Sequence, residues 1–150
     1  MAQRKVITIG QDEEFLRKKS KPVTNFDESL WVLLDDMWDT LEKYNGAGLS
    51  AVQVGVLKRV FIVGISGREE FINPQIIERG PKQKRVVEGC LSVPKKYSKV
   101  MRPTYVKVRA QDRFGKWFEK EFKGYEAQAV YHESDHLDGI LYIDLLEGEE

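Results

Sequence analysis

His132 and His136 are the only histidines in the chain, and they lie four residues apart with Glu133 directly after the first. On an α-helix, which turns by about 100° per residue, this spacing brings both imidazoles and the carboxylate onto one face. Two imidazoles on adjacent turns can bind a divalent metal ion, and the carboxylate can exchange a proton with a water at the metal's open position. Without a metal, the helix would bury these groups unpaired, because Tyr125 and Ala129 extend the same face towards the interior. The pattern therefore predicts a metal-binding helix at about residues 125–138.

A metal on this helix needs a third protein ligand, and the sequence leaves few choices. Extended zinc-protease motifs place a third histidine where this chain has Tyr142. The single cysteine, Cys90, follows a β-type run in a segment that contains glycine. A lone cysteine is more often a small buried hydrophobic residue, but a helix with two histidines and no third ligand favours the metal role. We expect Cys90, His132 and His136 to bind the metal.

Length and composition predict one globular domain over residues 1–150, with 41% hydrophobic and 32% charged residues. A single cysteine cannot form an internal disulfide, and the N-terminal segment resembles neither a signal peptide nor a transit peptide. We therefore expect a cytoplasmic protein. No uncharged apolar run approaches the ~18 residues of a membrane span. The net charge of zero argues against direct DNA binding.

Hydrophobic periodicity predicts an α+β fold. Apolar residues with helical spacing cover residues 30–41, after a weak capping signal formed by Thr24 and Asp27. The metal-binding helix is expected to begin after Gly124 and to end at Gly139. The order of helix, strands, helix and strand differs from the regular alternation of βαβ folds. Strands are predicted at residues 60–63, 86–87, 105–109, 117–122 and 140–143, with a hairpin turn at residues 112–115.

Charge is balanced over the whole chain but not locally. Between Glu78 and Arg109, basic residues exceed acidic ones by eight. The simpler interpretation is a set of solvated strand edges whose lysines block edge pairing. The alternative is a basic face for a polyanionic partner. The basic residues are Arg79, Lys82, Lys84, Arg85, Lys95, Lys96, Lys99, Arg102, Lys107 and Arg109.

The segment from Gly46 to Gly55 combines small residues with one amide side chain. Gly46 and Gly48, separated by one small residue, would let the backbone line a site closely. Gln53 offers an amide N–H to an oxygen that becomes negatively charged during a reaction. A helix C-terminus followed by a loop would give a similar pattern, and the glycine spacing differs from that of dinucleotide-binding loops.

Three segments in order resemble the signature motifs of the peptide deformylase family: GAGLSAVQ at residues 46–53, EGCLS at 88–92 and HESDH at 132–136. The similarity extends over nearly the whole chain. It implies an α+β fold in which the metal-binding helix packs against surrounding antiparallel β-sheets. It also implies a metal-dependent hydrolase that removes the formyl group from the N-terminal formyl-methionine of newly made polypeptides, through a metal-activated water.

The resemblance also implies roles for individual residues. The three expected ligands would hold the metal, for which the family suggests Fe²⁺, with Zn²⁺ or Ni²⁺ able to occupy the same site. Glu133 would be the general acid and base. The amide of Gln53 and the backbone N–H of Leu91 would bind the formyl oxygen as it becomes anionic.

The resemblance further predicts how the substrate is held. Gly48 and Gly89 would place backbone groups along the N-formylmethionyl peptide. Separately from substrate binding, the Glu–Arg pair of the family would correspond to Glu88 with Arg102. By similarity, and for the last three by helix phase, the residues near the methionine side chain would be Ala47, Tyr125, Gln128 and Ala129.

Two other functions are compatible with parts of this pattern. The chain could be a catalytically impaired homologue that holds a metal and binds formyl-peptides. Glu133 and Gln53, which a pure binding module would be free to lose, are both present. An endopeptidase is disfavoured because a cysteine stands in place of a third histidine or glutamate. Because the basic stretch at residues 79–109 contains Cys90, a contact with the ribosome beside the active site is a further hypothesis.

Overall fold

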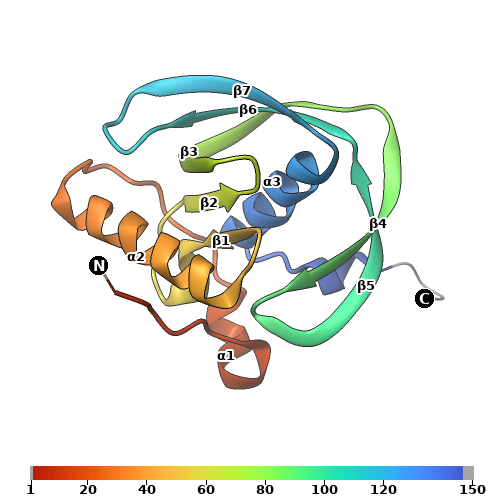
Figure 1. Cartoon of the computed structure of the whole chain (residues 1–150), viewed down its shortest axis with the longest axis horizontal. Helices are drawn as coiled ribbons and strands as arrows, with labels where there is room; N and C mark the ends of the chain where they lie inside the picture. The colour runs from red at the N-terminus through yellow and green to blue at the C-terminus, as the bar shows by residue number, and fades with distance from the viewer. Residues whose placement is uncertain (1, 147–150) are drawn as a thin grey trace.

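The computed structural model describes residues 2–146. Figure 1 shows the helices and strands in chain order, and the predicted α+β class is confirmed. The elements are α1 (Ile9–Leu16), α2 (Glu28–Tyr44), β1 (Gly48–Ser50), the 3₁₀ helix η1 (Ala51–Val54), β2 (Val60–Gly64), β3 (Arg68–Arg79), β4 (Gln83–Cys90), β5 (Val93–Pro103), β6 (Tyr105–Gln111), β7 (Trp117–Lys123), α3 (Gly124–Leu137) and the 3₁₀ helix η2 (Tyr142–Leu145).

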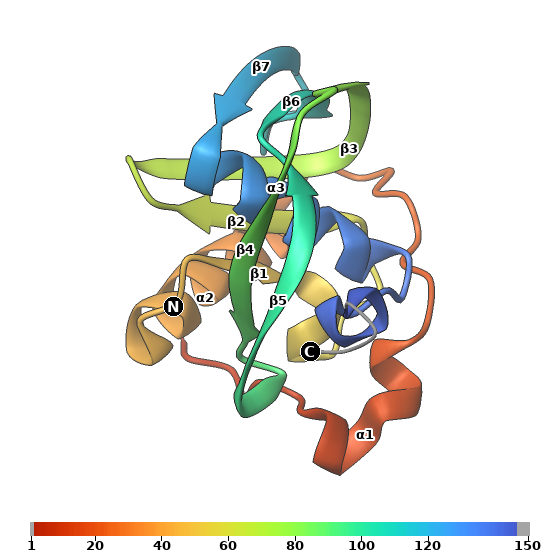
Figure 2. The same cartoon turned by 90° about the vertical axis from the view of Figure 1, so that its right-hand side faces the viewer.

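Two antiparallel sheets surround α3. Five strands form one sheet in the order β1-β2-β3-β6-β7, and β4 pairs with β5 in a separate two-stranded sheet. Helix α3 contacts strands of both sheets, and Figure 2 shows the β4–β5 pair crossing in front of it. The expectation that the histidine-bearing helix packs against antiparallel sheets is therefore confirmed.

Strand β2 of the five-stranded sheet is buried on both faces. Along β2, Phe61 and Val63 point into the core beneath α3, whereas Val60 and Ile62 point into the core beneath α2. Successive side chains of a strand face opposite sides of the sheet, so a strand between two helices must be apolar throughout. This explains the unbroken apolar run that made β2 easy to predict.

The predicted apolar face of residues 30–41 is buried as expected, but the capping prediction was wrong in detail. Asp27 itself is the N-cap of α2, and its side chain accepts a hydrogen bond from the Leu30 N–H at 3.4 Å. Thr24 lies before the helix and forms no part of the cap. At the other end, Asn45 closes α2 in the left-handed conformation.

One predicted strand is wrong. Residues 140–143 were expected to be extended, but Tyr142 begins the 3₁₀ helix η2. The carboxylate of Asp144 accepts a hydrogen bond from the Leu141 N–H at 3.0 Å, which stabilises the turn. Tyr142 is buried beneath the β4–β5 pair, and its hydroxyl donates to the Lys96 carbonyl at 3.0 Å. Tertiary burial of one aromatic side chain therefore outweighs the local β preference.

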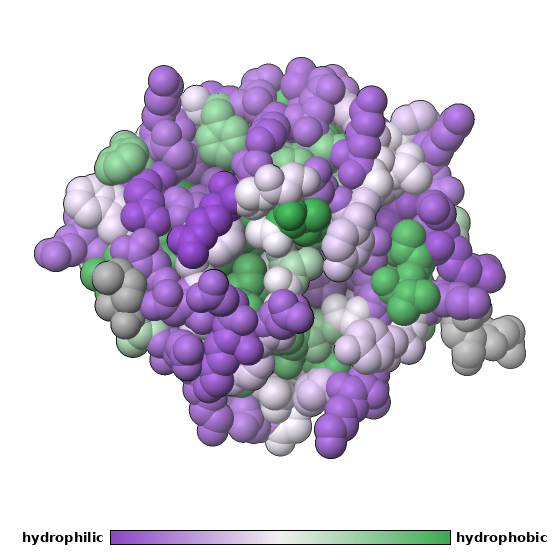
Figure 3. Space-filling model, in the orientation of Figure 1, coloured by the Kyte–Doolittle hydropathy of each residue, from purple (hydrophilic) through white to green (hydrophobic). Residues whose placement is uncertain are grey.

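The surface in Figure 3 is covered mostly by hydrophilic residues, with small groups of apolar side chains between them. Among the described residues, no helix is long and apolar enough to cross a membrane.

We expect the exchange of Gly139 for alanine to destabilise the fold. Gly139 follows α3 with φ of +76°, and a Cβ atom there would overlap the backbone carbonyl of Arg17. Strained left-handed backbone costs about 1–3 kcal/mol, and the overlap adds to it because backbone atoms cannot move aside cheaply. In urea unfolding, the free energy of unfolding of Gly139→Ala should therefore be lower than that of the wild type by at least about 1–3 kcal/mol.

The matched control is Gly10→Ala in α1, where the nearest atom to an added Cβ is 3.9 Å away. It should leave the free energy of unfolding within about 1 kcal/mol of the wild type. Equal stabilities for the two variants would contradict the role assigned to Gly139.

Candidate metal centre and active site

Helix α3 carries both histidines on one buried face. His132 is 8% exposed and His136 is fully buried, and their ring centroids are 5.1 Å apart. Burial, together with the positive groups of His132 and Arg102, lowers the pKa of His136 and so favours its neutral, ligating form. The spacing on which the sequence prediction relied thus brings the two imidazoles together.

Cys90 ends β4 and brings its thiol to the two histidines. Its Sγ atom is 3.3 Å from Nε2 of His136, and the donor atoms of Cys90, His132 and His136 all lie within 4.8 Å of one another. One thiol and two imidazoles form a donor set that suits Fe²⁺, Zn²⁺ or Ni²⁺, and three protein ligands leave one position open. The residues present therefore fit a catalytic metal.

A buried carboxylate orients one of these imidazoles. Oε1 of Glu88 lies 2.8 Å from Nδ1 of His132, so Nε2 of that ring is left to face a metal. Arg102 donates to both Glu88 oxygens, at 2.7 and 2.9 Å, and to Asp135 at 2.8 Å. Burial alone would raise the pKa of Glu88, but the hydrogen bonds from His132 and Arg102 lower it to about 2. The predicted Glu88–Arg102 pair is thus present and holds an ionised carboxylate against His132.

Glu133 lies against strand β1. Its Oε1 accepts a hydrogen bond from Oγ of Ser50 at 2.8 Å. A Cβ atom at Gly48 would come within 2.9 Å of both Cγ and Oε2 of Glu133, so only glycine lets the strand approach this closely. Burial raises the pKa of Glu133 to about 6, although His132 and the Ser50 hydroxyl act in the opposite direction. A carboxyl group whose pKa is near neutral suits both proton uptake and proton release.

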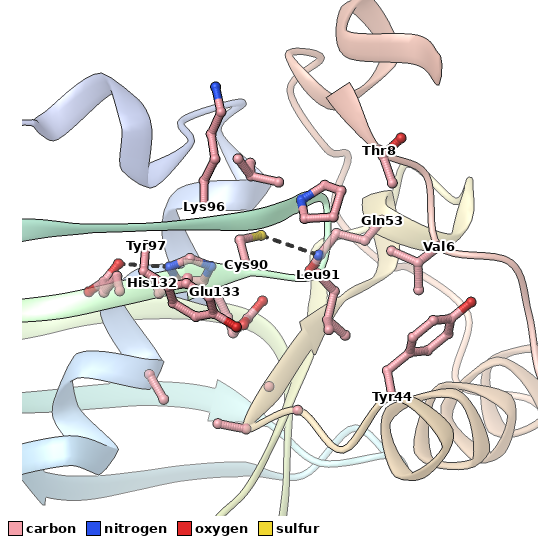
Figure 4. A pocket seen from close by; sticks show the side chains of 18 of the residues that line it. Val6, Thr8, Tyr44, Gln53, Cys90, Leu91, Lys96, Tyr97, His132 and Glu133 are labelled. Carbon is pink, nitrogen blue, oxygen red and sulfur yellow. Dashed lines mark hydrogen bonds and ion pairs between the residues drawn. The ribbon is translucent and has the colours of Figure 1, made fainter. Parts of the chain in front are cut away.

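Gln53 is held with its amide nitrogen towards the thiol. Its Oε1 accepts a hydrogen bond from the Ser50 N–H at 2.9 Å. Its Nε2 donates to Oγ of Ser92 at 3.0 Å and lies 3.7 Å from Sγ of Cys90, a contact drawn as a dashed line in Figure 4. The short 3₁₀ helix η1, which follows β1 directly, brings the side chain to this place.

A cavity of about 700 Å³ opens beside these groups. Of the residues predicted at the site, only His136 and Arg102 do not line this cavity, and both are buried. The expectation that Tyr125 faces the interior is wrong, because its side chain is 60% exposed and lies at the rim of the cavity, whereas Ala129 is buried as expected. The lining residues from the predicted site are Ala47, Gly48, Gln53, Gly89, Cys90, Leu91, Tyr125, Ala129, His132 and Glu133.

Gln128 also lines the cavity, as predicted, and is nearly buried. Its Nε2 donates to the Val87 carbonyl at 3.1 Å and so connects α3 to β4. At Gly89, an added Cβ atom would overlap the ring of Tyr97. The glycine therefore lets the ring of Tyr97 approach the backbone near the end of β4.

Sequence reasoning missed several parts of the site. Ser50 and Ser92 were part of the recognised motifs but received no role, although burial of a hydroxyl among small and apolar neighbours is a signal that could have found them. The N-terminal segment was missed because it carries no motif. In Figure 4 this segment, marked by Val6 and Thr8, lies beside α2, marked by Tyr44, on one side of the cavity. Strand β5, marked by Tyr97, and helix α3, marked by His132 and Glu133, lie on the opposite side.

Comparisons with known proteins agree with this geometry. The family model described as polypeptide deformylase matches residues 3–150. A peptide deformylase of Caldicellulosiruptor bescii is 53% identical over 145 residues, covering 96% of this chain and 86% of the relative. Peptide deformylase 1 of Bacillus subtilis is 48% identical, covering 95% of this chain and 89% of the relative.

Solved structures lead to the same family. The crystal structure of a peptide deformylase from Legionella pneumophila superposes with a TM-score of 0.93 at 42% identity, covering 97% of this chain and 87% of that one. The crystal structure of peptide deformylase from Thermotoga maritima superposes with a TM-score of 0.94 at 38% identity, covering 99% of this chain and 100% of that one. With its thiol and two imidazoles gathered beside a buried glutamate, and with this similarity along its length, the chain belongs to the polypeptide deformylase family.

Proposed function

We propose that this chain, acting as one catalytic domain over residues 1–150, hydrolyses the formamide bond of N-formylmethionyl peptides and releases formate. The observation that carries the proposal is the grouping of Cys90, His132 and His136 within 4.8 Å, with Glu133 beside them on the same helix. A binding module that has lost catalysis would have no use for a buried carboxylate next to the ligands, and burying one is costly.

A divalent metal held by the thiol and the two imidazoles would polarise the formyl group and make water acidic enough to react at neutral pH. Glu133 accepts a proton from the attacking water and returns it to the leaving amino group as the C–N bond breaks. Gln53 donates its amide N–H, and Leu91 its backbone N–H, to the formyl oxygen as negative charge develops there. Gly48 and Gly89 lie along the cavity, where their backbone groups can face the peptide.

We assign Fe²⁺ as the native metal, with Zn²⁺ or Ni²⁺ as alternative occupants. A thiolate with two neutral imidazoles binds each of these ions, so the donor set supports all three. The assignment of iron rests on the family resemblance. An accessible thiolate beside Fe²⁺ is sensitive to oxidation, so purification without oxygen is part of any test of activity.

We place the enzyme in the cytoplasm, where newly made polypeptides are its substrates. We also assign a contact with the ribosome to the basic stretch of residues 79–109. Lys82, Lys84, Lys95, Lys96 and Lys99 of this stretch are exposed on the β4–β5 pair and the residues just before it. Lys95 and Lys96 line the mouth of the cavity, so charge that attracts ribosomal RNA would lie where the nascent chain enters.

We expect Glu133→Gln to abolish most turnover while the metal stays bound. Glutamine keeps the size of the side chain but cannot carry a proton, and a positioned general acid and base contributes about 10²–10⁴-fold. Anaerobically purified wild type should deformylate formyl-Met-Ala-Ser but leave the acetylated peptide intact. The variant should bind metal in equal amount and lose turnover of the formyl-peptide by that factor.

The control for this experiment is His132→Ala, which should lose metal and activity together because it removes a ligand. A Glu133→Gln protein that keeps more than a tenth of the wild-type turnover with its metal in place would rule out the assigned mechanism.

Cys90→Ala should leave a site with two imidazoles, too few ligands to retain metal through purification. Elemental analysis should therefore find metal well below one equivalent in this variant and close to one in wild type purified in parallel. Full metal occupancy of Cys90→Ala would exclude the thiol as a ligand.

The ribosome contact predicts salt-sensitive co-sedimentation with ribosomes. Exchange of Lys95, Lys96 and Lys99 for glutamate should weaken sedimentation at low salt, while turnover of a short neutral formyl-peptide should change little with salt. The control carries the same change of charge at three exposed lysines outside the basic stretch, Lys18, Lys43 and Lys116. Equal binding by both triple variants would eliminate this surface as the contact.

A further inference from the structure

Ser50 contacts both side chains to which the proposed reaction assigns chemistry. It is the last residue of β1 and is fully buried. Its hydroxyl has one proton, which is shared between Oε1 of Glu133 at 2.8 Å and the Glu133 carbonyl oxygen at 2.9 Å. Its backbone N–H donates to Oε1 of Gln53 at 2.9 Å. One residue of the strand therefore connects the proton-transfer group with the amide that faces the formyl oxygen.

The hydroxyl of Ser50 restrains the carboxylate of Glu133. Within the part of the chain that the structure describes, Oγ is the only hydrogen-bond partner of this carboxylate. The second oxygen, Oε2, lies beside Gly48 on the same strand, and none of the residues that the structure describes donates a hydrogen bond to it. The two oxygens are thus unequal: Oε1 is fixed by Ser50, and Oε2 is left to exchange a proton.

The backbone of Ser50 sets the orientation of the Gln53 amide. An amide can present either its oxygen or its nitrogen to a neighbour, and the N–H of Ser50 selects the oxygen. The nitrogen then points towards Ser92 and Cys90, where a donor is needed. This contact uses the main chain, so changing the serine side chain leaves it in place.

We propose that Ser50 is a positioning residue whose hydroxyl holds the Glu133 carboxylate in the orientation required for proton transfer. The inference rests on the proposed function, because it assumes that Glu133 is the general acid and base. Ser50 touches the carboxylate and lies behind it, on the strand side, so it acts through Glu133. A donor fixed in a buried strand restrains the carboxylate without supplying a positive charge, so the carboxylate keeps its capacity to accept a proton.

The test begins with Ser50→Ala, which removes the hydroxyl and keeps the backbone contact to Gln53. We expect kcat for formyl-Met-Ala-Ser to fall about tenfold or more, the usual effect of losing a hydrogen bond to a charged group. KM should change by less than about twofold, because the hydroxyl acts on the carboxylate and not on the bound peptide. Metal content should stay at the wild-type level.

Ser20→Ala is the matched control. Ser20 is also buried, and its hydroxyl has no hydrogen-bond partner in the described residues. Removing it should leave kcat unchanged. A fall in kcat of less than about twofold in Ser50→Ala would overturn the positioning role.

A double-mutant cycle separates positioning from a general structural effect. In the Glu133→Gln background, where no proton can be shuttled, Ser50→Ala should cause no further loss of turnover. If Ser50 supported only the fold, Ser50→Ala would lower turnover by the same factor in both backgrounds, and the inference would be wrong. Failure of the wild type itself to deformylate the peptide would instead reject the proposed function.

Discussion

Burial of α3 between two sheets is the constraint on which the rest of the structure depends. A helix covered on both sides must be largely apolar and must pair most of the polar groups that it buries. Its apolar residues, including Ala127, Val130 and Leu137, fill the core against the five-stranded sheet. Its polar residues His132, Glu133 and Asp135 each have a partner on a surrounding strand, whereas Nδ1 of His136 has none among the described residues. The hydrogen bonds that offset the cost of burying the polar residues of α3 therefore also form the site.

Each partner comes from a different strand and serves a different purpose. The β4–β5 pair supplies Glu88 and Arg102, whose opposite charges are joined by two hydrogen bonds in a buried setting. Breaking such a pair leaves an uncompensated buried charge, which costs about 3–5 kcal/mol. Strand β1 supplies the hydroxyl of Ser50, and Gly48 on the same strand has no side chain, so Glu133 can pack directly against the backbone. The charged network thus orients His132, and the neutral strand positions the carboxylate of Glu133.

Metal binding and folding are linked in this arrangement. Cys90 lies at the end of β4 and the two histidines lie on α3, so the three donor atoms come within 4.8 Å of one another only after the two-stranded sheet packs against the helix. A metal that binds the assembled donors and not the unfolded chain stabilises the native state by mass action. The small core beneath this sheet, formed by Val93, Val100 and Tyr142, keeps the end of β4 in place.

The sequence alone determined the features that depend on local spacing. The i, i+4 histidines, the apolar faces of α2 and α3, and the apolar run of β2 each follow from helix or strand periodicity, and the motifs at residues 46–53, 88–92 and 132–136 indicated the family. Tertiary structure decided the rest. Strand β5 is rich in lysine and forms because β4 supplies its hydrogen bonds, residues 140–143 turn because Tyr142 is buried, and Ser50 meets Glu133 across 83 positions of the chain. No local pattern encodes these contacts, because each depends on which distant segment packs against it.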